Sequence, residues 1–95
     1  MPETISRDSR PRIAAKARLR YDRKAERYML LYPEKGLVLN PTAADIAKLC
    51  TGEQSVGAIV DQLASKYGKE ATVIEREVMD FLSALAERGL LQEAA

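Results

Sequence analysis

The sequence predicts an α+β fold in which a three-stranded antiparallel meander is followed by a bundle of three helices. Between residues 17 and 40 short segments have the period of two that is typical of strands, and after Asn40 apolar residues recur at a helical spacing of about 3.6. A chain of 95 residues is expected to form one domain. Strands that precede helices in so short a chain imply that the helices cover one face of the sheet.

The amino-terminal segment, residues 1–12, has no periodic apolar pattern and contains Pro2 and Pro11. We therefore expect a flexible arm there and a single domain over residues 13–92. The arm lacks the apolar stretch of a signal peptide, and no apolar run approaches the ~20 residues that a membrane span needs. A cytoplasmic protein is the resulting expectation, and a single cysteine fits a reducing compartment.

Three short segments carry the pattern of strands. Residues 17–22 alternate between apolar and polar side chains, as a half-buried strand does. Residues 27–32 are apolar on both faces, which is typical of a central strand. Between this strand and the next, Pro33 fixes an early φ of the turn and Gly36 is expected in the left-handed position. Residues 36–40 complete the meander as a short third strand.

Three helices are predicted from their first and last residues. Each is expected to begin at a capping side chain, namely Thr42 (with Asp45), Ser55 and Thr72 (with Glu75). Each is expected to end at a glycine, namely Gly52, Gly68 and Gly89. The short segment after the last helix, residues 89–92, is expected to cover the end of the core.

If the helices cover one face of the sheet, the opposite face has a different role. That face would carry basic and apolar side chains together: Arg18, Arg20, Met29, Leu31 and Val38. An apolar patch with a basic rim on an open sheet is more typical of an interface than of a solvated surface. We therefore predict a partner interface or self-association surface at Arg18, Arg20, Met29 and Leu31, with coverage by the arm as the alternative.

Charge is divided unevenly along the chain. Residues 1–35 hold ten Lys/Arg against five Asp/Glu, whereas residues 36–95 hold five against nine. The basic front half is either a solvated strand face or a surface that receives an acidic partner. The sequence alone leaves both explanations open.

The third strand is predicted to be an edge of the sheet, with backbone N–H and C=O groups unpaired on one side. An extended peptide can pair with such an edge, so that main-chain bonds give affinity and side-chain pockets give selectivity. The alternative is an edge that is short and protected from pairing.

Several kinds of active site have no support in the sequence. The chain has no histidine, and its one cysteine cannot form a thiolate metal site. The motifs GxxxxGK[ST], GxGxxG and GxSxG do not occur. No catalytic or metal-ligating residue is therefore assigned, and the chain is expected not to be an enzyme. Cys50 is expected to be a small buried thiol, and Tyr21, Tyr28 and Tyr32 to be packing residues.

Three stretches resemble the PqqD family across nearly the whole domain: RPRIAAKARLRYD at residues 10–22, LYPEKGLVLNPTAADIAKLCTG at residues 31–52 and EVMDFLSALAERGLL at residues 77–91. Four short runs are similar to the family's pattern: Tyr32-Pro33-Glu34, Leu39-Asn40, Thr42-Ala43 and Leu49-Cys50. Thr51 and Met79-Asp80 depart from it, at positions away from the predicted edge strand.

The resemblance implies a winged-helix-like domain of the RiPP recognition element type, which binds leader segments of ribosomally made peptides. PqqD-like proteins bind the precursor peptide PqqA and present it to the radical SAM enzyme PqqE in pyrroloquinoline quinone (PQQ) biosynthesis. The iron–sulfur clusters and S-adenosylmethionine belong to that enzyme, so the resemblance implies a non-catalytic peptide chaperone, an adaptor without a cofactor. The peptide is then expected as an added strand between the third strand and the third helix, against Leu37, Val38, Leu39, Val73, Arg76, Glu77 and Asp80.

Two other functions are compatible with parts of the sequence. A winged-helix DNA-binding regulator would use the third helix for recognition, but residues 73–88 carry four acidic side chains against two basic ones. The basic first strand keeps this alternative open, although we expect no nucleic-acid partner and no membrane. A dimerisation module is compatible with the apolar outer face, and a homodimer would not exclude peptide binding.

Overall fold

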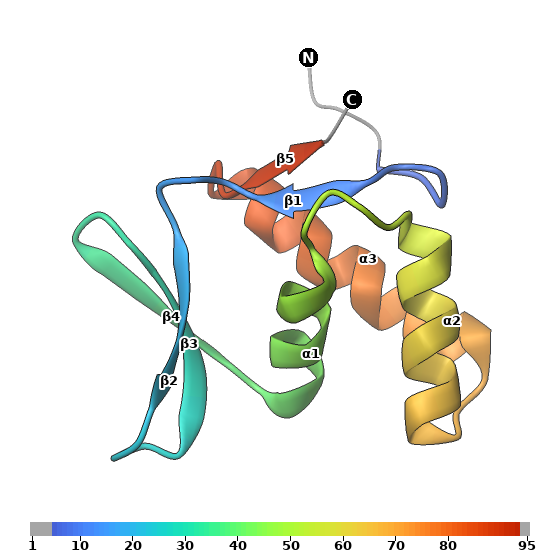
Figure 1. Cartoon of the computed structure of the whole chain (residues 1–95), viewed down its shortest axis with the longest axis horizontal. Coiled ribbons are helices and arrows are strands. Elements are labelled where there is room, and N and C mark those ends of the chain that lie inside the picture. Colours follow the sequence, from blue (N-terminus) through green and yellow to red (C-terminus); the bar gives the residue numbers. More distant parts are fainter. Residues whose placement is uncertain (1–4, 94–95) are drawn as a thin grey trace.

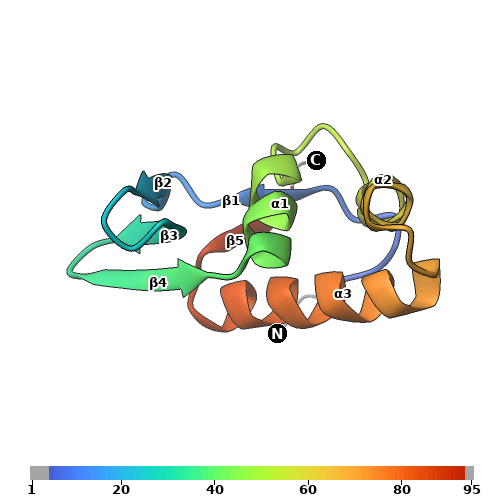
Figure 2. The ribbon, with the colours of Figure 1, turned by 90° about the horizontal axis from the view of Figure 1, so that it is seen from below.

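The computed structural model describes residues 5–93, which form five strands and three helices (Figure 1). In chain order they are β1 (Pro11–Ile13), β2 (Arg18–Asp22), β3 (Arg27–Tyr32), β4 (Lys35–Leu39), α1 (Pro41–Leu49), α2 (Val56–Tyr67), α3 (Ala71–Glu87) and β5 (Leu91–Glu93). β2, β3 and β4 form an antiparallel sheet in that order, followed by the three helices, which confirms the predicted fold class. Figures 1 and 2 show the sheet beside α1, with α2 on the far side of α1 and α3 running past both.

A second sheet of two strands joins the two ends of the described chain. β1 pairs antiparallel with β5, so that Arg12 lies opposite Gln92. Ala14 N donates to Leu90 O at 2.7 Å, and Ile13 N donates to Cys50 O at 3.2 Å. Leu90 is completely buried, so the segment after α3 closes one end of the core as expected. Neither strand was predicted, because three residues are too few to show an alternating pattern.

Residues 5–12, which the sequence assigns to a flexible arm, lie against the domain. Val56 N donates to Ser9 O at 2.8 Å, and Gly57 N donates to Arg7 O at 2.9 Å. These bonds satisfy backbone donors in the first turn of α2 that have no partner inside the helix. The expected domain start at residue 13 therefore falls inside β1, and the mobility of residues 5–12 stays a prediction. Pro2 lies outside the described residues.

α2 begins at Ser55 and ends at Gly68, as predicted from the sequence. Ser55 Oγ accepts from Ala58 N at 3.2 Å, and Gly68 ends the helix with a left-handed φ of 62°. The expected cap of α1 was wrong, because Asn40 rather than Thr42 takes that role. Asn40 Oδ1 accepts from Ala43 N at 2.8 Å, and Pro41, which has no N–H to satisfy, occupies the first helical position.

The start of α3, the end of α1 and the turn before β4 also differ from the expectation by one or two residues. α3 begins after Glu70 without a side-chain cap, so Thr72 lies inside the helix, and α1 ends at Cys50, before Gly52. The turn before β4 has only two residues, and Glu34, not Gly36, carries the positive φ of 63°. Pro33 fixes a negative φ at the first turn position, so the left-handed conformation falls on the residue that follows it.

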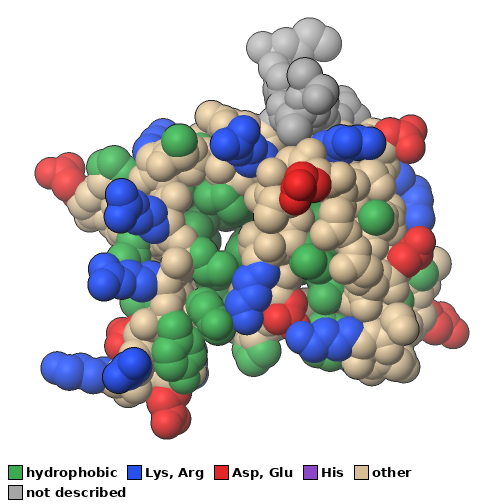
Figure 3. All heavy atoms as spheres, in the orientation of Figure 1, with side chains coloured by type: hydrophobic (Ala, Val, Ile, Leu, Met, Phe, Trp, Pro, Cys, Tyr) green, Lys and Arg blue, Asp and Glu red, His purple; other side chains and the backbone are tan. Residues whose placement is uncertain are grey.

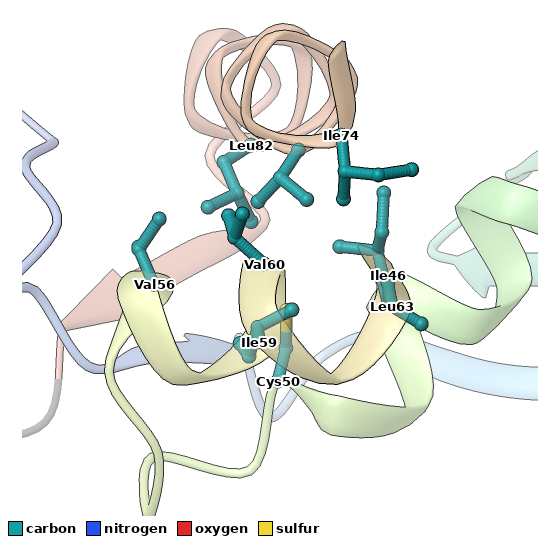
Figure 4. Packing of buried hydrophobic residues seen from close by; sticks show 9 residues of the cluster. Ile46, Cys50, Val56, Ile59, Val60, Leu63, Ile74 and Leu82 are labelled. Carbon is teal, nitrogen blue, oxygen red and sulfur yellow. The ribbon is translucent and has the colours of Figure 1, made fainter. Parts of the chain in front are cut away.

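Two clusters of buried apolar side chains stabilise the fold. The first joins the three helices and consists of Ile46, Cys50, Val56, Ile59, Val60, Leu63, Ile74, Val78 and Leu82 (Figure 4). The second lies between the sheet and the helices and consists of Leu30, Leu39, Ala44, Ala47, Leu85 and Leu90. α3 therefore packs against the other helices through Ile74, Val78 and Leu82, and against the sheet through Leu85. Among residues 5–93, no helix combines the length and the apolar character needed to cross a membrane.

Candidate functional site

β4 forms one edge of the three-stranded sheet, as predicted. It pairs with β3 on one side, with Leu37 opposite Leu30 and Val38 opposite Met29. Within residues 5–93, no strand pairs with its other side. A row of backbone N–H and C=O groups is therefore available to a further strand.

The three predicted side chains of β4 lie in different environments. Leu39 is only 3% exposed, and Leu37 packs at the margin of the same cluster. Val38 points to the opposite face of the sheet, where 51% of its surface is exposed. Leu39 therefore offers almost no side-chain surface to a peptide at the free edge, whereas Val38 can offer an apolar side chain.

The predicted helix residues lie in the first ten residues of α3, outside the buried stripe of that helix. Val73, Arg76, Glu77 and Asp80 are all exposed. Leu85, in the last turns of α3, belongs to the same buried cluster as Leu39 of β4, whereas Ile74, near the start of α3, belongs to the cluster shared with α2. Asp80 is therefore the closest of the four to the strand along the helix, and Val73 lies ~10 Å further away at a rise of about 1.5 Å per residue.

The part of α3 that approaches β4 could not be identified from the sequence. Phe81 is half-buried and packs against both core clusters, including the one that contains Leu39. Phe81 lies at the helical period of the buried residues Ile74, Val78 and Leu85. That period cannot show at which turn a helix meets the sheet, so no sequence signal distinguishes Phe81 from the other stripe residues.

The four predicted interface residues share the outer face of the sheet. Arg18 lies opposite Leu31 and Arg20 lies opposite Met29, and directly opposed side chains point to the same face. Val38, opposite Met29, extends this row to the edge strand. The arm residues 5–12 do not cover the face, because they lie against α2 and β5. We call this surface, Arg18, Arg20, Met29, Leu31 and Val38, the outer patch.

Neither the sheet edge nor the outer patch contains a group suited to catalysis. Cys50 is buried as predicted, and this burial raises the pKa of its thiol to about 12. A thiol with so high a pKa is not a nucleophile near neutral pH. Among residues 5–93, no group of three or more Asp, Glu or Cys side chains is placed to hold a metal ion. The site offers backbone pairing and side-chain contact.

Sequence comparison places the chain among PQQ synthesis proteins. The family described as "Coenzyme PQQ synthesis protein D (PqqD)" matches residues 27–91. A "PqqA binding protein" of Rhodopseudomonas palustris (strain BisB5) is 42% identical over 91 residues, which cover 96% of this chain and 89% of that protein. A protein of the same description from Xanthomonas campestris pv. campestris (strain B100) is 36% identical and covers 94% of this chain and 97% of its own length.

Solved structures agree with this placement. The solution NMR structure of the PqqD part of Methylobacterium extorquens PqqCD, described as a stand-alone RiPP recognition element, has a TM-score of 0.82 at 30% identity, covering 96% of this chain and 97% of that one. TbiB1, solved in complex with the TbiA(beta) leader peptide, has a TM-score of 0.73 at 24% identity, covering 85% and 94%, and shows the fold alone. The family match over residues 27–91 and the near full-length relatives show that this chain belongs to the PqqD family.

Proposed function

We propose that this protein is a non-catalytic peptide chaperone of PQQ biosynthesis, which binds the precursor peptide PqqA by strand addition and presents it to PqqE. The observation that carries the proposal is the free edge of β4, which can accept an extended peptide. The names of the relatives support the choice of peptide, since they are described as PqqA binding proteins.

The register of β4 indicates which backbone groups would bind the peptide. β3 and β4 are joined by a two-residue turn, with Tyr32 opposite Lys35. The pair that closes such a turn is hydrogen-bonded, and bonded and non-bonded pairs alternate along an antiparallel ladder. The N–H groups of Leu37 and Leu39 would therefore point to β3, and those of Gly36 and Val38 to the free edge. A peptide strand would bond to the latter two.

The exposed side of α3 would supply the remaining contacts. The helix has 17 residues and is therefore ~25 Å long at about 1.5 Å per residue. An extended peptide of about eight residues has the same length, so one segment could run from the edge of β4 along the helix. Arg76 is the one positively charged residue among the four predicted helix contacts, so an acidic peptide side chain is expected there. Glu77 and Asp80 would receive basic or polar side chains.

The outer patch is the surface that we assign to PqqE. Strand addition at an edge leaves both faces of a sheet free, so the outer patch stays accessible when the peptide is bound. Its arginines would fit an acidic surface, and its apolar residues would supply buried area. A second copy of this chain is the alternative occupant, and sedimentation of the isolated protein distinguishes the two.

An NMR titration of the ¹⁵N-labelled protein with PqqA tests the proposal. We expect amide shift changes at residues 36–40 and along the exposed side of α3, because the peptide would bond to the first and contact the second. Random duplex DNA serves as the control and should cause no saturable change. Shift changes elsewhere, with residues 36–40 unaffected at saturating peptide, would contradict strand addition.

A further inference from the structure

A pocket separate from the β4 edge and the outer patch lies between the β2–β3 hairpin, the start of α1 and the end of α2. Its volume is about 670 Å³, within the range of about 300–1,000 Å³ that is usual for small-ligand sites. Figure 3 shows a hollow between the strands and the helices that is lined by hydrophobic side chains and bordered by basic ones.

Aromatic and apolar side chains form the floor of this pocket. The rings of Tyr21 and Tyr28 meet edge to face, with their centroids 5.1 Å apart. Tyr21 was expected to be a packing residue, yet 48% of its surface is exposed. The buried side chains of Leu39 and Ala44 line the pocket beneath the rings. A further aromatic ring could therefore pack against Tyr21 and gain apolar contact.

The charges around the pocket are only partly compensated. Asp45 accepts hydrogen bonds from Tyr67 Oη and from Lys66 Nζ, the latter at 2.9 Å. Lys48 Nζ lies 4.2 Å from the centroid of the Tyr28 ring. Within residues 5–93, the ion pairs are Arg7 with Glu75 and Lys66 with Asp45, so Lys48 has no carboxylate within ion-pair distance, although its charge acts on Asp45 from further away. The ammonium of Lys48 therefore lies over the Tyr28 ring and has N–H donors available for a ligand.

These features favour a carboxylate over a phosphate. Phosphate oxygens need several donors, and the start of α1 offers few, because Asn40 caps the Ala43 N–H and Pro41 has none. Arg27 lines the pocket, but strand alternation places its side chain on the face opposite to that of Tyr28. The pocket offers one ammonium, that of Lys48, beside apolar and aromatic side chains. A ligand with one carboxylate attached to an apolar group is complementary to this arrangement.

We propose that this pocket is a second binding site, which takes an aromatic carboxylate with its ring against Tyr21 and its carboxylate on Lys48. A free aromatic acid and the carboxyl-terminal aromatic residue of a peptide share this chemistry. The site shares Leu39 with the predicted peptide contacts, but it uses neither the unpaired backbone groups of β4 nor the outer patch, so it does not depend on the proposed function.

The test is an NMR titration of the ¹⁵N-labelled full chain with 4-hydroxyphenylacetate and with its uncharged amide. We expect the acid to bind about tenfold more tightly than the amide, because only the acid can pair with the Lys48 ammonium. The amides that shift should belong to residues 21–28 and 44–48. N-acetyltyrosine, which resembles the carboxyl-terminal residue of a peptide, is the second acid. If it binds more tightly than 4-hydroxyphenylacetate, the natural ligand is the carboxyl terminus of a peptide. If it binds more weakly, the natural ligand is a free aromatic acid.

Two substitutions with opposite expected effects test the role of charge. Lys48→Gln should weaken binding of the acid about tenfold and leave the amide unchanged, while Lys69→Gln, outside the pocket, should change neither. Asp45→Asn should tighten binding of the acid about threefold, because it removes a repelling carboxylate and keeps an oxygen for Tyr67. Equal affinities for acid and amide, or an acid affinity that neither substitution changes, would overturn the proposal.

Discussion

The phenol of Tyr67 donates a hydrogen bond to the carboxylate of Asp45, and this contact joins the last turn of α2 to α1. Lys66 Nζ lies 2.9 Å from Asp45 Oδ2. The two helices otherwise meet through apolar side chains of the first core cluster. The polar contact therefore joins the middle of α1 to the last turn of α2 beside the pocket that Tyr21, Tyr28 and Lys48 line, which we call the aromatic pocket.

Asp45→Asn is expected to destabilise the fold in a pH-dependent way. Burial alone raises the pKa of Asp45, but the hydrogen bonds from Tyr67 and Lys66 outweigh it and hold the pKa below its usual value of 3.8. A carboxylate with a lowered folded-state pKa stabilises the fold above its unfolded pKa and loses this contribution as the pH falls through the folded value. We expect the substitution to lower the free energy of unfolding by about 1 kcal/mol at pH 7 and by less below about pH 3.8, measured by urea unfolding.

The control for this experiment is Asp61→Asn, an exposed carboxylate on α2. This substitution should change the free energy of unfolding little at either pH. If Asp45→Asn lowers the free energy of unfolding by the same amount at pH 7 and at pH 3, the ionised carboxylate contributes nothing to stability.

Tyr67 should titrate above the usual pKa of a phenol. The hydrogen bond to Asp45 and, to a smaller extent, burial raise the pKa of Tyr67 above 10.0. A raised folded-state pKa stabilises the fold below the unfolded pKa, and this contribution is lost as the pH rises through the folded value. We expect the Tyr67 ring resonances to titrate at lower pH in Asp45→Asn than in the unsubstituted protein. An unchanged midpoint would assign the shift to burial instead.

The sequence predicts the elements of this fold well because most of them are long enough to show a period. β3 was predicted with its observed bounds, and Ser55 and Gly68 mark the ends of α2. β1 and β5 were missed because they are three residues each and are stabilised by pairing with each other across the chain. Asn40 was missed as a cap because Thr42 with Asp45 offers a competing pattern two residues later.

The candidate sites were predictable where they depend on strand alternation. Alternation placed Arg18, Arg20, Met29 and Leu31 on one face, as the register confirms. The groove beside α3 stays a prediction, because helical periodicity gives the exposed side of a helix and not its distance from a strand. The aromatic pocket was not predicted, since Lys48 and Tyr28 meet only through the packing of α1 on β3.

Cys50 is expected to be unreactive in the folded protein. Burial raises the pKa of its thiol to about 12, so almost no thiolate is present at pH 8. We expect no reaction with Ellman's reagent under native conditions and complete reaction in denaturant, measured by absorbance. Fast modification of the folded protein would show that the end of α1 opens readily.

The two arginines of the outer patch, Arg18 and Arg20, should contribute to binding of PqqE and not to binding of the peptide. Arg18→Glu with Arg20→Glu reverses two exposed charges, so we expect about a tenfold loss of PqqE affinity at low salt and a smaller loss at high salt. Arg23→Glu, in the β2–β3 turn, is the control for a general charge effect. PqqA affinity should be the same in all variants. Loss of peptide binding together with PqqE binding would place the peptide on this face.

Val38→Pro should remove peptide binding with little effect on folding. Proline has no N–H, and the register directs the N–H of Val38 to the free edge, so the ladder with β3 would keep its bonds. We expect at least about a tenfold loss of PqqA affinity by calorimetry and a change of at most about 1 kcal/mol in the free energy of unfolding. Val38→Thr keeps both the N–H and the β-branched shape, so it should bind nearly as well as the unsubstituted protein. Equal affinities of the proline and threonine variants, both folded, would exclude the edge of β4 as the peptide site.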